Sequence, residues 1–125
     1  MARILLVEDD ADFRELVQMT LEIAGFQVAA VDTLAAAVEL ARAQAFDLYV
    51  LDNRLPDGDG QELCQRIRRF DPRQPILFLS GEARSARVQE MISCGAQACL
   101  IKPVDPDEIV ATVGLLLDPP PGPLP

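Results

Sequence analysis

Histidine and tryptophan are both absent from this chain of 125 residues. Without histidine, the chain cannot form imidazole metal sites, Ser-His or Cys-His nucleophile systems, or a phosphohistidine of its own. Any chemistry must therefore use carboxylates, hydroxyls, thiols or lysine. Aromatic residues make up only 5% of the chain while 50% is hydrophobic, so the core of one ordinary domain must be mainly aliphatic.

Basic residues are also scarce, with 11 Lys and Arg against 20 Asp and Glu and a net charge of −9. This balance disfavours direct binding to nucleic acids and to anionic membranes, because both need a basic surface. No apolar run approaches the roughly 20 residues that span a bilayer, and the first run is too short for a signal peptide. We therefore expect a cytoplasmic protein.

The chain has three cysteines, an odd number, and they show no CxxC spacing. They are Cys64, Cys94 and Cys99. This pattern is typical of small core residues in a reducing compartment rather than of a disulfide framework or a zinc site.

Five short apolar runs follow one another, each continuous rather than alternating with polar residues. Continuous runs are typical of strands in a parallel sheet that is buried on both faces. The expected strands are Ile4 to Val7, Gln27 to Val31, Leu48 to Leu51, Ile76 to Leu79 and Cys99 to Ile101.

Apolar residues at helical spacing follow each of these runs. They mark helices over Phe13 to Ala24, Leu34 to Ala41, Leu63 to Phe70, Val88 to Ile92 and Ile109 to Leu116. Asp9 or Asp10 can cap the first helix, Asp32 or Thr33 the second, and Asp105 the last. A fivefold βα repeat predicts a doubly wound α/β domain with right-handed crossovers. We assign residues 1–118 to this domain and residues 119–125 to a Pro-rich tail or linker.

Polar groups follow four of the five expected strands. These groups are Glu8, Asp9 and Asp10 after the first strand, Asp52 after the third, Ser80 after the fourth and Lys102 after the fifth. In open α/β sheets, ligands bind beyond the carboxyl ends of the strands. Any one of these residues alone has an ordinary reading as a cap, a turn former or a solvated charge. Together, converging carboxylates repel one another unless a cation such as Mg²⁺ neutralises them.

This set of groups suits phosphoryl transfer. A bound Mg²⁺ neutralises the approach of a phosphoryl group. The Asp52 carboxylate can then act as a nucleophile and become an aspartyl phosphate. The amine of Lys102 and the hydroxyl of Ser80 can hold the remaining phosphoryl oxygens.

Four segments, "ILLVEDD", "LYVLDNRLPDGDG", "FLSGEA" and "CLIKPV", resemble in order and spacing the signatures of response-regulator receiver domains of two-component signalling. The resemblance covers Arg3 to about Leu117. It implies a flavodoxin-like (βα)5 three-layer sandwich with a five-stranded parallel sheet in the order 2-1-3-4-5. It also implies a cis peptide bond between Lys102 and Pro103.

The resemblance assigns a role to each candidate residue. It implies Asp52 as the phosphoacceptor, Ser80 as the switch hydroxyl, Lys102 as the partner of the phosphoryl group, and a Mg²⁺ site of Glu8, Asp9, Asp52 and the backbone carbonyl of Arg54. Asp9 is expected to be a more direct ligand than Glu8.

The resemblance also implies partners. The phosphodonor would be a histidine kinase or a histidine phosphotransfer protein, and the chain would be a signalling phosphoacceptor that assists its own phosphotransfer and autodephosphorylation rather than an enzyme. Residues 84–117 would contact a protein effector or an attached output domain. Phosphorylation-linked homodimerisation is a further expectation, while direct binding of this chain to nucleic acid or membrane is not expected.

Two positions depart from the family pattern. Cys99 lies three residues before the lysine, where the family usually has Tyr or Phe, and a thiol cannot fill the volume of such a ring. Val104 follows the proline, where the family often has Phe. An alternative hypothesis is that Cys99 is a redox-sensitive thiol. A separate hypothesis is that Arg54 and Glu82 pair over the site and slow dephosphorylation.

Other functions remain as alternatives. A Mg²⁺-dependent phosphohydrolase would use the same nucleophile, but such enzymes commonly have a second carboxylate where this chain has Arg54. A phosphorylation-independent binding module is the next alternative. A nucleotide or flavin binder is disfavoured by the lack of a GxGxxG or Walker-type loop.

Overall fold

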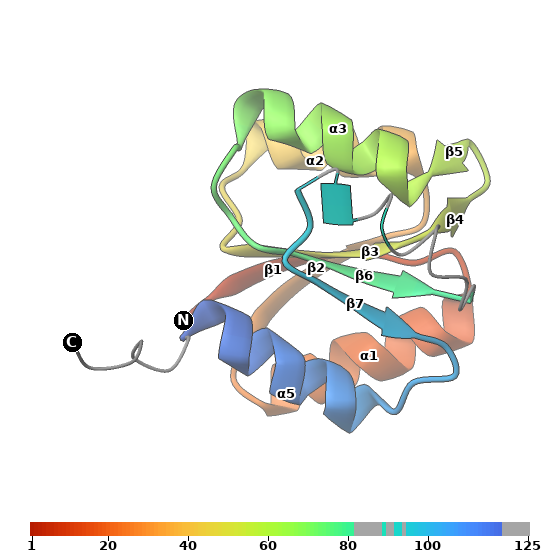
Figure 1. The fold of residues 1–125 in the computed structure, drawn as a ribbon. Helices are drawn as coiled ribbons and strands as arrows, with labels where there is room; N and C mark the ends of the chain where they lie inside the picture. The colour runs from red at the N-terminus through yellow and green to blue at the C-terminus, as the bar shows by residue number, and fades with distance from the viewer. Residues whose placement is uncertain (82–88, 90–91, 94, 119–125) are drawn as a thin grey trace.

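The computed structural model describes residues 1–81, 89, 92–93 and 95–118. A five-stranded parallel sheet lies between two layers of helices (Figure 1). Its strands are β1 (Arg3–Val7), β2 (Gln27–Val31), β3 (Leu48–Asp52), β6 (Ile76–Ser80) and β7 (Ala98–Ile101), in the order β2-β1-β3-β6-β7. This is the predicted 2-1-3-4-5 order of a flavodoxin-like fold, which is therefore confirmed.

In the part of the chain that the structure describes, helices cover both faces of the sheet (Figure 1). One face packs against α2 (Leu34–Ala43) and α3 (Gly60–Phe70), and the other against α1 (Ala11–Ile23) and α5 (Pro106–Leu117). The helix that the sequence predicts over Val88 to Ile92 falls largely outside the described residues. Among the described residues, no helix is long and apolar enough to cross a membrane.

The continuous apolar strands fill two separate cores. In β1, Leu5 and Val7 pack with the helices α2 and α3, whereas Ile4 and Leu6 pack with α1 and α5. This follows from the alternation of side chains along a strand, since a sheet covered on both faces needs apolar residues at every position. All five residues of β3 are buried, including the terminal Asp52.

Side-chain caps fix where the helices begin. Asp10 accepts a hydrogen bond from the backbone N–H of Phe13 at 3.1 Å and caps α1, so Asp9 is not the capping residue. Thr33 caps α2, and Asp105 caps α5 as predicted. The α1 helix ends before Gly25, whose φ of 102° is the left-handed conformation that glycine adopts readily.

The loop after β3 contains a small hairpin that the sequence did not predict. Its strands are β4 (Arg54–Leu55) and β5 (Gly58–Asp59). At its turn, Asp57 accepts hydrogen bonds from the backbone N–H groups of Leu34 at 2.7 Å and Ala35 at 3.0 Å. The loop that follows the buried carboxylate of Asp52 is therefore tied to the start of α2.

Candidate functional site

The carboxyl ends of the strands bring the polar groups together. The last pairs in register are Val7 with Leu51, Asp52 with Leu79, and Ser80 with Ile101. The residues at and after these strand ends therefore meet at one edge of the sheet. A pocket of about 420 Å³ lies there, lined by Asp9, Asp52, Asn53, Arg54, Gly81 and Lys102.

Lys102 joins two of the acidic residues. Its Nζ atom lies 2.7 Å from Oε1 of Glu8 and 3.2 Å from Oδ1 of Asp52. Glu8 is fully buried and Asp52 is 5% exposed, whereas 28% of the Lys102 side chain is exposed. The ammonium thus compensates two carboxylates from the open side of the site.

Glu8 uses both carboxylate oxygens within the protein. Oε1 accepts from Lys102, and Oε2 accepts from the backbone N–H of Asp10 at 3.1 Å. Asp9 is exposed and lines the pocket. One carboxylate oxygen from each of Glu8, Asp9 and Asp52 lies within 4.8 Å of the others.

The close carboxylates change one another's ionisation. Burial, followed by hydrogen bonding with Glu8 and Asp9 and by the charge of Glu8, raises the pKa of Asp52 to about 7, although the charge of Lys102 opposes this. The hydrogen bond with Asp52 lowers the pKa of Asp9. Burial alone would lower the pKa of Lys102, but its contacts with Glu8 and Asp52 raise it overall. The cluster therefore holds more negative charge than one ammonium balances.

This donor set fits a hard divalent cation. Mg²⁺ is bound by carboxylate and carbonyl oxygens, usually through one or two carboxylates with several retained water molecules. Asp9 and Asp52 both present carboxylates to the pocket, which also has room for water. Glu8 is buried outside the pocket lining, and its two oxygens already accept hydrogen bonds.

The two other predicted site residues have different positions. Ser80 is fully buried at the end of β6, and its backbone carbonyl accepts from the N–H of Lys102 at 2.6 Å. Gly81, rather than the Ser80 side chain, forms the pocket wall beside it. Arg54 is exposed and lines the pocket. The expected pairing of Arg54 with Glu82 lies outside the described residues.

Three residues contribute to the site although sequence reasoning did not single them out. The Lys102 Nζ atom lies 5.3 Å from the centre of the Phe13 ring. Asn53 is buried, and its backbone carbonyl accepts from the N–H of Gly60 at 2.8 Å. A Cβ atom on Gly60 would lie 2.6 Å from the backbone oxygen of Asp52. The position of Gly60 just after the "DGD" turn is the only sequence signal for this close approach.

The two departures from the family pattern are both at least partly buried. Cys99 pairs with Phe78 in the sheet and packs beside the core cluster that contains Phe78. Burial raises the pKa of its thiol, which disfavours the reactive thiolate and argues against a redox role. Val104 is buried in the opposite core. The Lys102–Pro103 peptide bond is cis, as the resemblance implied.

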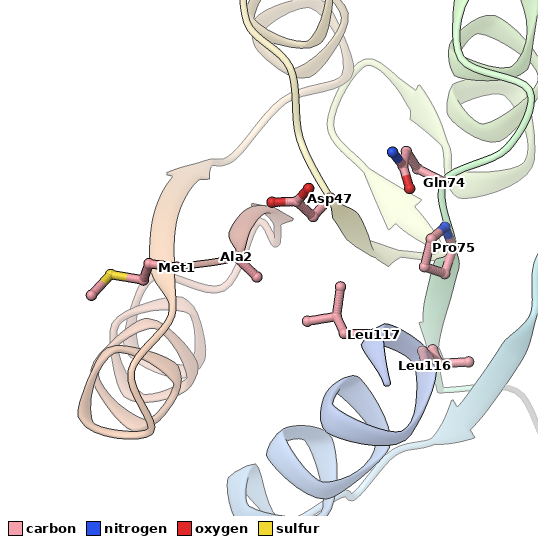
Figure 2. Close-up of a pocket in the computed structure, with 7 residues that line it drawn as sticks. All are labelled: Met1, Ala2, Asp47, Gln74, Pro75, Leu116 and Leu117. Carbon is pink, nitrogen blue, oxygen red and sulfur yellow. The ribbon is translucent and has the colours of Figure 1, made fainter. Parts of the chain in front are cut away.

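A second pocket of about 480 Å³ lies at the opposite, amino end of the strands (Figure 2). It is lined by Met1, Ala2, Asp47, Gln74, Pro75, Leu116 and Leu117. Asp47 has the only ionisable side chain of this set, and it already accepts the backbone N–H of Arg3 at 2.7 Å. Because no set of convergent charged groups lines this pocket, the carboxyl edge is the candidate functional site.

Comparison with known proteins finds similar sequences and structures. The family model of the response regulator receiver domain matches residues 4–114. The transcriptional regulatory protein CseB of Streptomyces coelicolor is 38% identical over 114 residues, which cover 91% of this chain and 48% of CseB. The response regulator protein FleR of Pseudomonas aeruginosa is 36% identical over 104 residues, which cover 83% of this chain and 22% of FleR. The chain therefore spans less than half the length of these two curated relatives.

The fold is also similar to that of a solved structure. The non-phosphorylated receiver domain of HemR from Leptospira biflexa superposes with a TM-score of 0.90 at 33% identity. The match covers 99% of this chain and 100% of that chain.

Proposed function

This chain belongs to the family of response regulator receiver domains of two-component signalling, and we propose that Asp52 is its phosphoacceptor. A receiver is a signalling phosphoacceptor rather than an enzyme. The observation that carries the proposal is the position of the Asp52 carboxylate, which a fully buried strand holds in the wall of the pocket 3.2 Å from the Lys102 ammonium.

Asp9 and Asp52 would hold Mg²⁺, together with the backbone carbonyl of Arg54. Glu8 would support the site indirectly, since both its oxygens accept hydrogen bonds from the protein. When bound, Mg²⁺ would neutralise charge between the carboxylates and an incoming phosphoryl group. The exposed position of Asp9 beside the buried Asp52 supports this division of roles.

The reaction is then a simple transfer. A carboxylate oxygen of Asp52 attacks phosphorus, and the bond from phosphorus to a histidine nitrogen of the donor breaks. The electron pair of that bond remains with the leaving imidazole, and the product is an aspartyl phosphate. Lys102 shifts its hydrogen bond from the carboxylate to a phosphoryl oxygen, and the Ser80 hydroxyl donates a hydrogen bond to another phosphoryl oxygen.

The receiver fold implies a histidine kinase as partner; a histidine phosphotransfer protein is the other donor that we propose. Contact with an effector or output domain would use residues 84–117, of which the structure describes 89, 92–93 and 95–117. Because Cys99 is small, any switch in this chain must work without a large ring at that position. We place the protein in the cytoplasm, where such kinases present their phosphohistidine.

Intact mass after incubation with acetyl phosphate tests this proposal. We expect the chain to gain one phosphoryl group in the presence of Mg²⁺ and none when the metal is chelated. Asp52→Asn should abolish the gain, whereas Asp12→Asn, a change to an exposed carboxylate outside the pocket, should leave it intact. Equal gain by the Asp52→Asn protein would contradict the proposal.

A further inference from the structure

The first turn of α1 supports the lysine of the site. The Lys102 Nζ atom lies 5.3 Å from the centre of the Phe13 ring, while Glu8 and Asp52 accept its hydrogen bonds. We propose that Phe13 is a positioning residue that keeps the Lys102 ammonium against the phosphoacceptor. The inference rests on the proposed role of Asp52 and extends it to a residue that does not touch the phosphoryl group.

Lys102 needs such support because its side chain is long and has an open path to water. With 28% of that side chain exposed, the ammonium can exchange its two carboxylate contacts for solvent. An aromatic ring attracts a cation through the negative charge of its π face, most strongly where water is excluded. The ring of Phe13 is partly buried and packs against the core cluster of α1 and α5.

The protein fixes the ring through the backbone of the same turn. The N–H of Phe13 donates to Oδ1 of the capping Asp10 at 3.1 Å. The next residue, Arg14, donates from Nη1 to the backbone carbonyl of Glu8 at 2.9 Å. One helical turn therefore fixes both the carboxylate loop and the ring that faces the lysine.

Lys102 also separates two pockets. It lines the pocket at Asp52 and a neighbouring one of about 240 Å³, whose other lining residues are Asp10, Phe13, Pro103 and Val104. A smaller aliphatic side chain at position 13 would enlarge the neighbouring pocket and remove the π face. The ammonium would then have room to turn away from Asp52.

The expected effect appears on the rate of phosphorylation. If the ammonium leaves Asp52 for part of the time, fewer encounters with a phosphodonor find the site assembled. We expect Phe13→Leu to slow phosphorylation by acetyl phosphate about fivefold at saturating Mg²⁺, the size of effect that a partly buried cation–π contact supports. Phe13→Tyr keeps the ring face and should react within about twofold of the wild type.

A second readout separates positioning from packing. In the unphosphorylated protein, the Lys102 ammonium can be observed directly by nitrogen-15 NMR, and its proton shifts report the ring current of Phe13. Loss of the ring removes its ring current in any case, so exchange with water is the deciding readout. We expect Phe13→Leu to accelerate this exchange and Phe13→Tyr to preserve it. Phe70→Leu is a matched control, because it removes a ring that also lies near a cation but is not at the site. The guanidinium carbon of Arg42 lies 5.7 Å from the centre of the Phe70 ring. It should change neither the Lys102 signal nor the rate.

The outcomes are distinct. Unchanged exchange of the Lys102 ammonium protons with water and an unchanged rate of phosphorylation in Phe13→Leu would overturn the positioning role, and so would equal slowing by Phe13→Tyr. If the wild type is not phosphorylated, the proposed function fails, but the NMR comparison still decides whether Phe13 holds the lysine. Urea unfolding of each variant shows whether a slower rate reflects loss of the folded state.

Discussion

The Lys102 ammonium lies 3.2 Å from Oδ1 of Asp52, although 50 positions separate the two residues in the chain. This contact joins the ends of β3 and β7, which are not neighbours in the sheet. At the site, the Lys102 ammonium contacts two of three close carboxylates. The three carboxylates therefore repel one another, and either a divalent cation or the removal of a carboxylate would relieve this repulsion.

Replacing Asp52 by Asn should stabilise the metal-free protein. The change removes one buried carboxylate from the cluster, while Lys102 keeps its hydrogen bond with Glu8. We expect the free energy of unfolding to rise by about 1–2 kcal/mol, measured by urea denaturation with a metal chelator present. Asp12→Asn should shift it by less than about 0.5 kcal/mol. A lower stability of the Asp52→Asn protein would mean that the repulsion is not significant.

Mg²⁺ should stabilise the wild type through Asp9. A ligand that binds only the folded state at ten times its dissociation constant adds about 1.4 kcal/mol. We expect this gain in a Mg²⁺ titration followed by urea unfolding, and a much smaller gain after Asp9→Asn. If Asp9→Asn responds to Mg²⁺ as the wild type does, Asp9 is not a ligand.

Gly60→Ala should disturb the site through the backbone of Asp52. The added Cβ atom would lie 2.6 Å from both the backbone oxygen of Asp52 and Cε1 of Phe78, closer than packed atoms approach. We expect a loss of about 2 kcal/mol in the free energy of unfolding, together with slower phosphorylation. Gly114→Ala in α5 is the control, because its Cβ would meet nothing within 4 Å. That change should stabilise the helix by about 0.5–1 kcal/mol, and equal behaviour of the two variants would refute the argument.

Tyr49 should make the fold sensitive to alkali. Its hydroxyl donates to Oδ2 of Asp71 at 2.7 Å, and burial, followed by this hydrogen bond, raises the pKa of the phenol. A raised pKa means that the folded state disfavours the phenolate. The stability that Tyr49 contributes is therefore complete below the unfolded-state pKa of about 10 and is lost as the pH rises above it.

The comparison protein for this effect is Tyr49→Phe. At neutral pH, loss of the hydrogen bond should lower its free energy of unfolding by about 1 kcal/mol. Above pH about 10, its stability should fall less steeply than that of the wild type. Tyr49 is the only tyrosine and the chain has no tryptophan, so ultraviolet absorbance follows its ionisation alone. Titration of Tyr49 at the ordinary tyrosine pKa would contradict the raised value.

The elements of the fold could largely be predicted because burial on both faces leaves a clear pattern. Continuous apolar runs located all five strands of the sheet to within a residue at each end. The hairpin around Asp57 could not be predicted, because its strands have only two residues each and the Asp57 carboxylate accepts hydrogen bonds from N–H groups of the distant α2. Such contacts between distant segments leave no periodic signal in a sequence.

The site was predicted unevenly for a similar reason. Polar residues after apolar runs identified Asp52 and Lys102, because strand ends meet at one edge of a parallel sheet. From the sequence, Phe13 is an ordinary apolar residue of a helix, since its contact with Lys102 joins segments that are far apart in the chain. The sequence likewise did not show that both carboxylate oxygens of Glu8 accept hydrogen bonds from within the protein.

The central claim is that the phosphoryl group is attached to Asp52. After reaction with acetyl phosphate and Mg²⁺, borohydride reduces an acyl phosphate and converts the modified aspartate to homoserine, which peptide mass spectrometry can locate. We predict homoserine at position 52 in the Mg²⁺-treated protein and none in a sample treated with chelator. Homoserine at Asp9 or Asp10 instead, or at no position in a protein that has gained a phosphoryl group, would contradict the claim.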